Sequence, residues 1–239
     1  MPAGTACRIV AALFIGGVAC ASAAPPNEIK VFTDELASYR EHTLETHVNK
    51  GNASAPLQIM PEYSYGIHPN WELSLQLPFA FTTEQAKAEG YRVELQYIAP
   101  HNEEEGLYWG INVEVARINR IDEQSYWNLE LIPIVGYRRA RWHVVANPAL
   151  EKPSSGSAVM WSPSAKVAYR AFGRNYFGAE YYVEAGPLRH RLPSGEQSRT
   201  VYLAWDGNAG RSDVNLGIGR GLTDASERWV IKSIIEIAF

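Results

Sequence analysis

Strict alternation of apolar and polar residues is the feature that most restricts how this chain folds. Between residues 71 and 81, one face of an extended strand carries only large apolar side chains, and the other face carries none. The apolar positions are Trp71, Leu73, Leu75, Leu77, Phe79 and Phe81. The same period of two recurs from Tyr91 to Tyr97 and from Leu107 to Val115, with turn residues between the segments. The pattern predicts an all-β protein.

Twelve strands are predicted along the chain. They lie near residues 41–50, 57–67, 71–81, 91–100, 106–119, 125–138, 140–147, 157–171, 175–186, 197–206, 211–221 and 228–239. An even strand number is typical of single-chain barrels of the bacterial outer membrane, and about ten tilted residues cross a bilayer. We therefore expect a 12-stranded antiparallel transmembrane β-barrel over residues 41–239, located in the bacterial outer membrane and surrounded by its lipid.

Alternation alone also fits a soluble β-sandwich or a lipocalin-like barrel, whose apolar face points inward. The placement of aromatic residues favours the membrane, because Trp and Tyr gather at strand ends, where aromatic girdles meet lipid headgroups. They are Trp71, Tyr91, Trp109, Trp127, Tyr137, Trp142, Trp161, Trp205 and Trp229. The final segment resembles the C-terminal insertion signal read by the barrel assembly machinery, which is an expected partner. That signal would comprise Trp229, Ile231, Ile235, Ile237 and Phe239.

Residues 1–23 are typical of a secretory signal peptide. Arg8 precedes a short apolar run, and Ala21-Ser22-Ala23 forms a cleavage motif. An N-terminal membrane anchor and a lipoprotein signal at Cys20 are the alternatives. Residues 24–40 have no clean period, and we expect an N-terminal arm or a partial plug of the lumen. The formal net charge of −4 argues against a nucleic-acid partner.

Pro61, Pro133 and Pro163 fall inside predicted strands. Proline removes a hydrogen bond between strands, and a closed barrel has no free edge where that loss is harmless. We therefore expect β-bulges at these three positions.

The polar faces of the strands are expected to line the lumen. The alternate positions that form these polar faces supply thirteen charged candidates for binding or selectivity: Glu62, Glu72, Glu94, Glu114, Glu130, Glu180, Glu184, Glu236, Arg92, Arg138, Lys166, Arg170 and Lys232. Eight acids face five bases, so most charges can pair across strands, and the excess favours cations or neutral molecules. The alternative is that these charges only fill and brace a modest lumen.

Known catalytic motifs are absent from the sequence. It contains no Gly-x-Ser-x-Gly, no His-Glu-x-x-His, no phosphate-binding glycine loop and no cysteine ligand in the mature chain. Glu45 and His47 form the best acid–histidine pair but have no serine at a recognisable spacing, and His190 has Ser194 nearby but no orienting acid. We expect no catalytic residues, no metal and no cofactor. An outer-leaflet lipid-modifying enzyme centred on His47 or His190 is the rival hypothesis.

Residues 65–73, Tyr-Gly-Ile-His-Pro-Asn-Trp-Glu-Leu, followed by Leu77-Pro78-Phe79, resemble the bacterial outer-membrane proteins of the MetA-pathway of phenol degradation family. Residues 217–224, leading to Phe239, are similar to the closing hairpin of that family, whereas the turn at 68–70 departs from its more usual Thr-Asp type. The resemblance implies a link to the uptake of aromatic compounds but assigns no functional residues.

The function expected from these observations is a narrow channel or passive transporter for small solutes, with aromatic solutes suggested by the resemblance. A closed structural or surface-interaction barrel, sealed by the lumen charges and residues 27–40, is the alternative.

Overall fold

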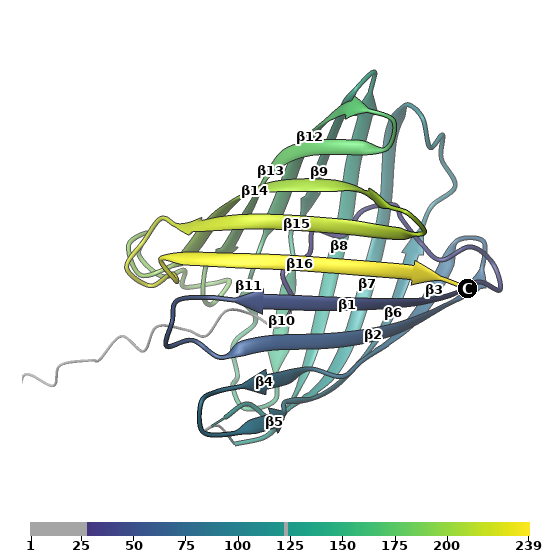
Figure 1. Ribbon diagram of the computed structural model, residues 1–239. Coiled ribbons are helices and arrows are strands. Elements are labelled where there is room, and N and C mark those ends of the chain that lie inside the picture. Colours follow the sequence, from purple (N-terminus) through teal and green to yellow (C-terminus); the bar gives the residue numbers. More distant parts are fainter. Residues whose placement is uncertain (1–27, 122–123) are drawn as a thin grey trace, which may run out of the picture.

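The protein is one antiparallel sheet that closes on itself as a barrel. A computed structural model describes residues 28–121 and 124–239, so the predicted signal peptide and residues 24–27 lie outside the described residues. Closure occurs because β1 (His42–Lys50) pairs with both β2 (Leu57–His68) and β16 (Trp229–Ala238) (Figure 1). No helix in the described part of the chain is long and apolar enough to cross a bilayer.

Sixteen strand segments make twelve passes of the wall, which confirms the predicted 12-stranded antiparallel barrel. Between β2 and β16 they are β3 (Trp71–Gln76), β4 (Phe79–Phe81), β5 (Ala86–Ala88), β6 (Gly90–Ile98), β7 (Gly106–Ile118), β8 (Tyr126–Arg139), β9 (Trp142–Asn147), β10 (Leu150–Pro153), β11 (Met160–Trp161), β12 (Ser164–Phe172), β13 (Asn175–Glu184), β14 (Ser198–Ala209) and β15 (Ser212–Gly221). β3 and β4 form one pass of the wall because both pair with β2, and β9 and β10 form one pass because both pair with β8. In the same way, β5 leads into β6, and β11 leads into β12. The stretch between the predicted strands 140–147 and 157–171 therefore contains the strand β10.

The prolines are accommodated differently from expectation. Pro61 lies on β2 opposite the break between β3 and β4. The carbonyl of Pro61 accepts a hydrogen bond from the Leu77 amide at 3.0 Å, and the N–H that proline lacks would have pointed to the same side. Pro133 on β8 likewise faces the break between β9 and β10, while Pro163 stands in the break before β12. The register shifts occur elsewhere, between Gly66 and His68 and between Arg170 and Phe172. The expected bulges at the prolines are thus wrong: interrupted strands, not bulges, spare the missing hydrogen bonds.

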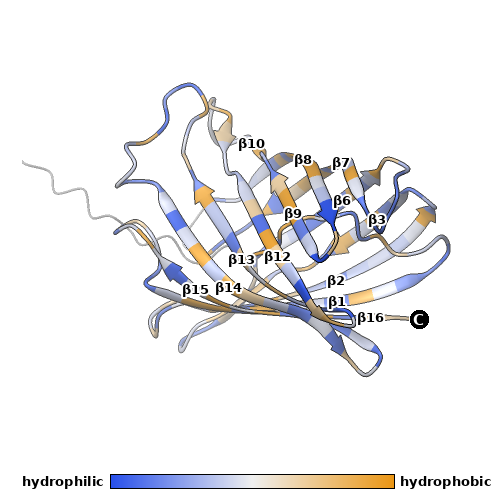
Figure 2. Cartoon of the chain, turned by 90° about the horizontal axis from the view of Figure 1, so that it is seen from above, coloured by the Kyte–Doolittle hydropathy of each residue, from blue (hydrophilic) through white to orange (hydrophobic). Residues whose placement is uncertain are grey.

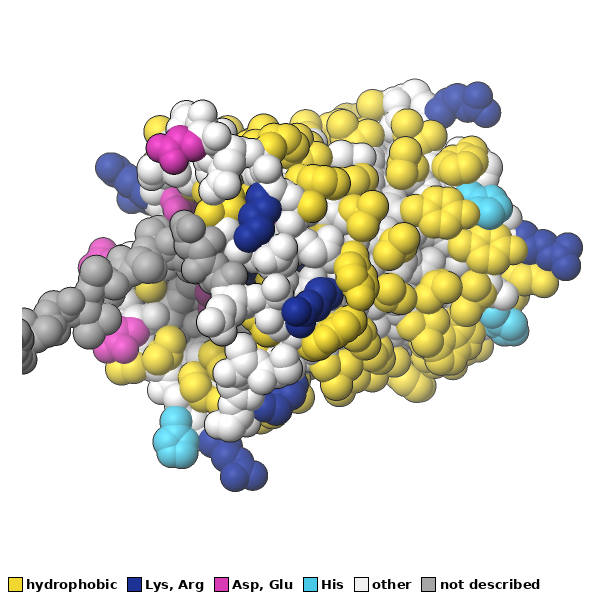
Figure 3. Space-filling model, turned by 90° about the horizontal axis from the view of Figure 1, so that it is seen from below, with side chains coloured by type: hydrophobic (Ala, Val, Ile, Leu, Met, Phe, Trp, Pro, Cys, Tyr) yellow, Lys and Arg dark blue, Asp and Glu magenta, His cyan; other side chains and the backbone are white. Residues whose placement is uncertain are grey.

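The apolar face of the wall points outward. Leu75, Leu129, Leu203 and Ile231 are among the exposed residues, and apolar bands alternate with polar ones along the strands (Figure 2). In Figure 3 hydrophobic side chains cover much of the wall, and Lys and Arg stand mainly toward its ends. A soluble barrel would bury this face, so the alternation here is that of a membrane barrel.

Aromatic residues lie in two groups on that outer face. Near the short turns, Tyr97 contacts both Trp71 and Trp109, with ring centroids 4.7 and 5.9 Å apart. Toward the opposite end, Tyr91 meets Trp127 edge to face at 6.0 Å. This arrangement matches the two headgroup girdles of membrane barrels. The five residues of the predicted insertion signal are exposed on the same face, from Trp229 to Phe239.

A charge placed between the two girdles should destabilise the barrel. Leu131 faces outward on β8, between Trp127 and Tyr137. Leu131→Arg should lower the free energy of unfolding in lipid vesicles by about 2–4 kcal/mol, because an arginine at the bilayer midplane costs that much in such barrels. Urea titrations should show the loss for Leu131→Arg and a much smaller one for Leu131→Ala. Equal stability of the two variants would contradict a lipid-facing position.

Candidate functional site

The thirteen charged residues predicted for the lumen occupy the inner side of the wall to different depths. Glu62, Arg92, Glu94, Glu114, Lys166, Glu180 and Lys232 are buried; Glu72, Glu130, Arg138, Arg170 and Glu236 are half-buried; and Glu184 is exposed. Lys232 on β16 forms an ion pair with Glu180 on β13, although two strands separate them in the sheet. Such a contact joins wall strands that are not direct neighbours in the sheet.

Residues 28–41 pass through the lumen and fill it as an arm. Asn147 donates to the carbonyl of Phe32 at 3.1 Å, and Gln96 donates to the carbonyls of Thr33 and Glu35 at 3.1 and 3.2 Å. At the end of the barrel where the short turns lie, called the turn end below, the Arg40 amide donates a hydrogen bond to the carbonyl of Gly66 at 2.7 Å. Inward-facing amide side chains thus satisfy a backbone that has no strand partner of its own. The arm is held at several points along its length.

Part of the inner face is apolar, contrary to the wholly polar lumen that parity suggested. Phe32 and Val31 of the arm pack in one cluster with residues of four strands and adjoining positions: Ile98, Tyr108, Ile132, Ile134, Val145 and Ala149. A second cluster joins Ile29 to Tyr202 and Val230. The segment from Leu131 to Val135 is apolar on both faces because its inward residues meet the arm. The arm therefore has its own hydrophobic contacts inside the barrel.

Two networks of charge anchor the arm, one centred on β1 and the other on the neighbouring strand β16. Lys30 of the arm lies 2.9 Å from Glu45 on β1, and His47 contacts both Glu45 and Glu62 at 2.5 and 3.4 Å. On β16, Lys232 donates to Glu180 and to the carbonyl of Ile29, the latter at 3.1 Å. Each network combines wall residues with the arm, which supplies the Lys30 cation to the first and the Ile29 carbonyl to the second.

A third network holds the turn end of the arm. The carboxylate of Asp34 accepts hydrogen bonds from Arg138 and, at 2.8 Å, from His101. Burial opposes ionisation of Asp34, but the hydrogen bonds from Arg138 and His101 outweigh it and lower the pKa of Asp34 below its ordinary value. The arm is therefore tied here by a carboxylate that remains charged at neutral pH.

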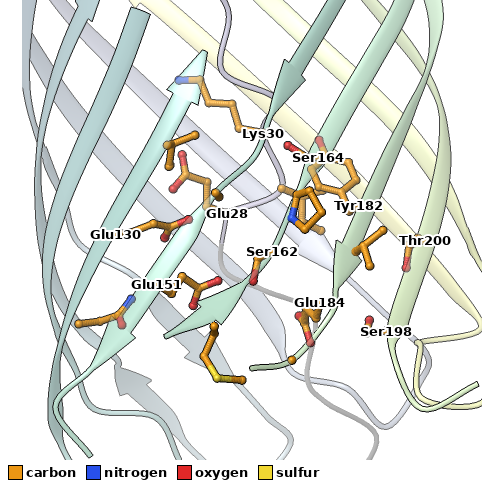
Figure 4. Close-up of a pocket in the computed structure, with 18 of the residues that line it drawn as sticks. Glu28, Lys30, Glu130, Glu151, Ser162, Ser164, Tyr182, Glu184, Ser198 and Thr200 are labelled. Atoms are coloured by element: carbon orange, nitrogen blue, oxygen red, sulfur yellow. The ribbon is translucent and has the colours of Figure 1, made fainter. Parts of the chain in front are cut away.

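A cavity of about 490 Å³ opens between the arm and the wall on the side of the longer loops. One wall carries Glu28, Glu130 and Glu151, and the facing wall carries Tyr182 and a row of hydroxyls (Figure 4). Those hydroxyls belong to Ser162, Ser164, Ser198 and Thr200. Glu151 stands directly opposite Glu130 in the pairing of β10 with β8. The cavity combines excess negative charge with an aromatic surface, which suits a small cationic or neutral guest.

Several residues of the site escaped the sequence reasoning. Asp206 shares its inward parity with Tyr202 on β14 and pairs with Lys166 at 2.7 Å, so parity would have found it. Glu28, Lys30 and Asp34 lie in the arm, whose sequence has no period to reveal an inward face.

The two histidines considered for catalysis occupy different environments. His47 is buried between Glu45 and Glu62, whereas His190 is exposed in the segment between β13 and β14. Neither makes a hydrogen bond to a serine among the described residues. His143, also buried, instead contacts the hydroxyl of Tyr108 at 2.7 Å.

One solved structure of an outer-membrane channel has a similar fold. The barrel matches the COG4313 outer membrane channel from Pseudomonas putida F1 with a TM-score of 0.67 and 11% identity, over 89% of this chain and 100% of that chain. LpxR from Salmonella typhimurium gives a TM-score of 0.46 at 8% identity over 82% and 99% of the two chains. A loop deletion mutant of OmpT from Vibrio cholerae gives 0.40 at 10% identity over 83% and 98%. No family model and no curated protein matches the sequence. The closed 12-pass wall, its apolar outer face and the first of these likenesses define the fold as an outer-membrane β-barrel.

Breaking the ion pair between β13 and β16 should be costly. Lys232→Met leaves the buried Glu180 carboxylate with the neutral donors Tyr182 and Asn215 and with Lys166 as a more distant cation at 3.7 Å. We expect a loss of about 3–5 kcal/mol in the free energy of unfolding, because removing one partner leaves the charge of the other buried without that partner. Urea titration of the barrel in lipid vesicles measures this loss of stability. The double variant Lys232→Met, Glu180→Gln should lose less than the sum of the single losses; strict additivity would contradict a direct pair.

The contribution of Asp34 to docking of the arm should persist far into the acid range. Because the folded-state pKa of Asp34 is lowered, its contribution is complete above the ordinary value of 3.8 and disappears as pH falls through the lower folded value. The ratio of amide hydrogen exchange rates of residues 28–41 between Asp34→Asn and the parent should therefore stay constant from neutral pH to about pH 4. Asp34→Asn should speed this exchange about tenfold or more at neutral pH, since hydrogen bonds to a charged group are lost. Unchanged exchange in Asp34→Asn would contradict the anchor.

Proposed function

We propose that this protein is a narrow outer-membrane channel for small cationic or neutral solutes, aromatic ones included, with the N-terminal arm as its constriction. The observation that carries the proposal is the cavity beside the arm. Glu130, Glu151 and Glu184 line it and form no ion pair with any described residue. Six acidic side chains line the cavity against three basic ones, and this excess of negative charge at one mouth attracts cations and repels anions.

The other contacts of the cavity support the same class of solute. Tyr182 and Phe32 give it an aromatic surface, on which an aromatic ring or an organic cation can stack. The hydroxyls of Ser162 and Thr200 offer hydrogen bonds on the facing wall. The likeness in fold to the COG4313 outer membrane channel, and the resemblance to the phenol-degradation family, point the same way.

A closed barrel is the second candidate, favoured by the apolar cluster around Phe32. That cluster fills the lumen between β6, β7, β8 and β9, and water and ions avoid such a region. Solutes would then reach the periplasmic side only if the arm moves. The two candidates differ in whether the arm moves far enough under native conditions to pass a solute.

Single-channel recording in planar bilayers separates these functions. The complete barrel should pass a small cation-preferring current, and deletion of residues 28–38 should increase that current severalfold, because the deletion removes the segment that crosses the lumen. Current only after the deletion would identify the closed barrel. No current from either protein, once both show the heat-modifiable migration of a folded barrel, would exclude the channel.

Removing the three acids that form no ion pair should weaken the preference for cations. The triple variant Glu130→Gln, Glu151→Gln, Glu184→Gln should lower the cation-to-anion permeability ratio about threefold or more, since local charge sets the local ion concentration. The matched control changes Glu103, Glu104 and Glu105, in the turn between β6 and β7 at the other mouth, to Gln. An equal effect of both triple variants would show that net charge, not the cavity, sets selectivity.

A further inference from the structure

Glu28 of the arm meets two buried carboxylates of the wall in one small space. Oxygen atoms of Glu28, Glu94 and Glu114 all lie within 4.8 Å of one another. Glu28 also belongs to a second close group, with His47 and Glu62. The arm thus supplies the one residue that both groups share, and any ligand bound there would join the arm to the wall.

The charges of this region do not balance. Five carboxylates are in contact here, those of Glu28, Glu45, Glu62, Glu94 and Glu114, against three cationic groups, those of Lys30, Arg92 and His47. Even with His47 protonated, two negative charges remain uncompensated. Arg92 reaches Glu28 and Glu114 at 3.4 and 3.3 Å, but Glu94 receives only the neutral amides of Gln76 and Asn112, at 2.6 and 3.0 Å.

Unpaired acceptors lie at the same place. Oε1 of Glu28, whose side chain is only 10% exposed, has no hydrogen-bond partner among the described residues. The side-chain oxygens of Gln76 and Asn112, the two fully buried residues that reach Glu94, likewise have none. Buried acceptors without donors are costly, and oxygen atoms of carboxylates and amides are the ligands that hard divalent cations prefer.

We infer that Glu28, Glu94 and Glu114 bind a divalent cation of the Ca²⁺ type, which fastens the N-terminal arm to β6 and β7. Two positive charges match the deficit of two. Ca²⁺ accepts an irregular set of oxygen ligands, whereas Mg²⁺ demands a near-ideal octahedron, so Ca²⁺ suits a site shared between a wall and a separate segment. The binding itself does not depend on the proposed channel; only its consequence, a cation that stabilises the constriction, rests on that function.

Equilibrium dialysis with ⁴⁵Ca²⁺ tests the site on the full barrel in detergent after chelator treatment. One ion per barrel should bind, and Glu94→Gln and Glu28→Gln should each weaken binding at least tenfold. Glu184→Gln, which removes a carboxylate from the same cavity outside the site, should bind like the parent. Because Glu28 lies on the arm, Glu28→Gln leaves the wall intact, and heat-modifiable migration verifies folding of every variant.

Hydrogen exchange supplies a readout of the fastening. Adding Ca²⁺ should slow the exchange of residues 28–41 about tenfold in the parent and leave it unchanged in Glu28→Gln. Absence of Ca²⁺ binding at millimolar concentration would mean that protons compensate the carboxylates, and it would overturn the inference. Binding that is insensitive to Glu28→Gln and Glu94→Gln would overturn it as well, by placing the ion elsewhere. Neither result bears on whether the barrel conducts, which the bilayer recordings decide separately.

Discussion

Closure between β1 and β16 is the constraint on which the rest of this structure depends. In a bilayer every backbone N–H and C=O needs a partner within the protein, and a closed sheet is the arrangement of strands that provides it. Closure leaves no edge, so Pro61 and Pro133 are placed where a neighbouring strand is already interrupted. It also sorts side chains into two sets, because alternate residues must face either lipid or lumen.

The lumen that closure creates is lined by charged side chains and is partly occupied by the arm. Buried charges are tolerated when they are paired and hydrogen-bonded, and here the arm takes part in the pairing through Lys30 and Asp34. Its backbone carbonyls also serve as acceptors for Lys232 and Asn147. The wall and the arm are therefore complementary. The wall carries hydrogen-bond donors and carboxylates that its own strands do not pair, and charged groups and carbonyls of the arm bind to some of them.

The sequence was sufficient to predict the wall and its closure but not the contents of the lumen. Strand number and parity follow from local alternation, which is why Leu75 and Glu94 could be assigned to opposite faces. The positions of Glu28 and Asp34 could not be predicted, because the arm has no period and its partners are remote in sequence. Asp34, for example, contacts Arg138 more than a hundred residues away. The loss of parity from Leu131 to Val135 was a usable signal that something apolar fills the lumen there.

That apolar stretch supplies only part of what holds the arm in place. Phe32 and Val31 are buried against Ile132 and Ile134, and burying a side chain of this size contributes roughly 1.5–3 kcal/mol. Ordering a flexible segment costs about 1–2 kcal/mol for each residue fixed, so the apolar contacts alone do not hold residues 28–41 in place. The polar contacts at Lys30, Asp34 and the arm carbonyls must supply the remainder. Docking of the arm is then a small difference between large opposing contributions, and a change of one charge in the lumen suffices to shift it.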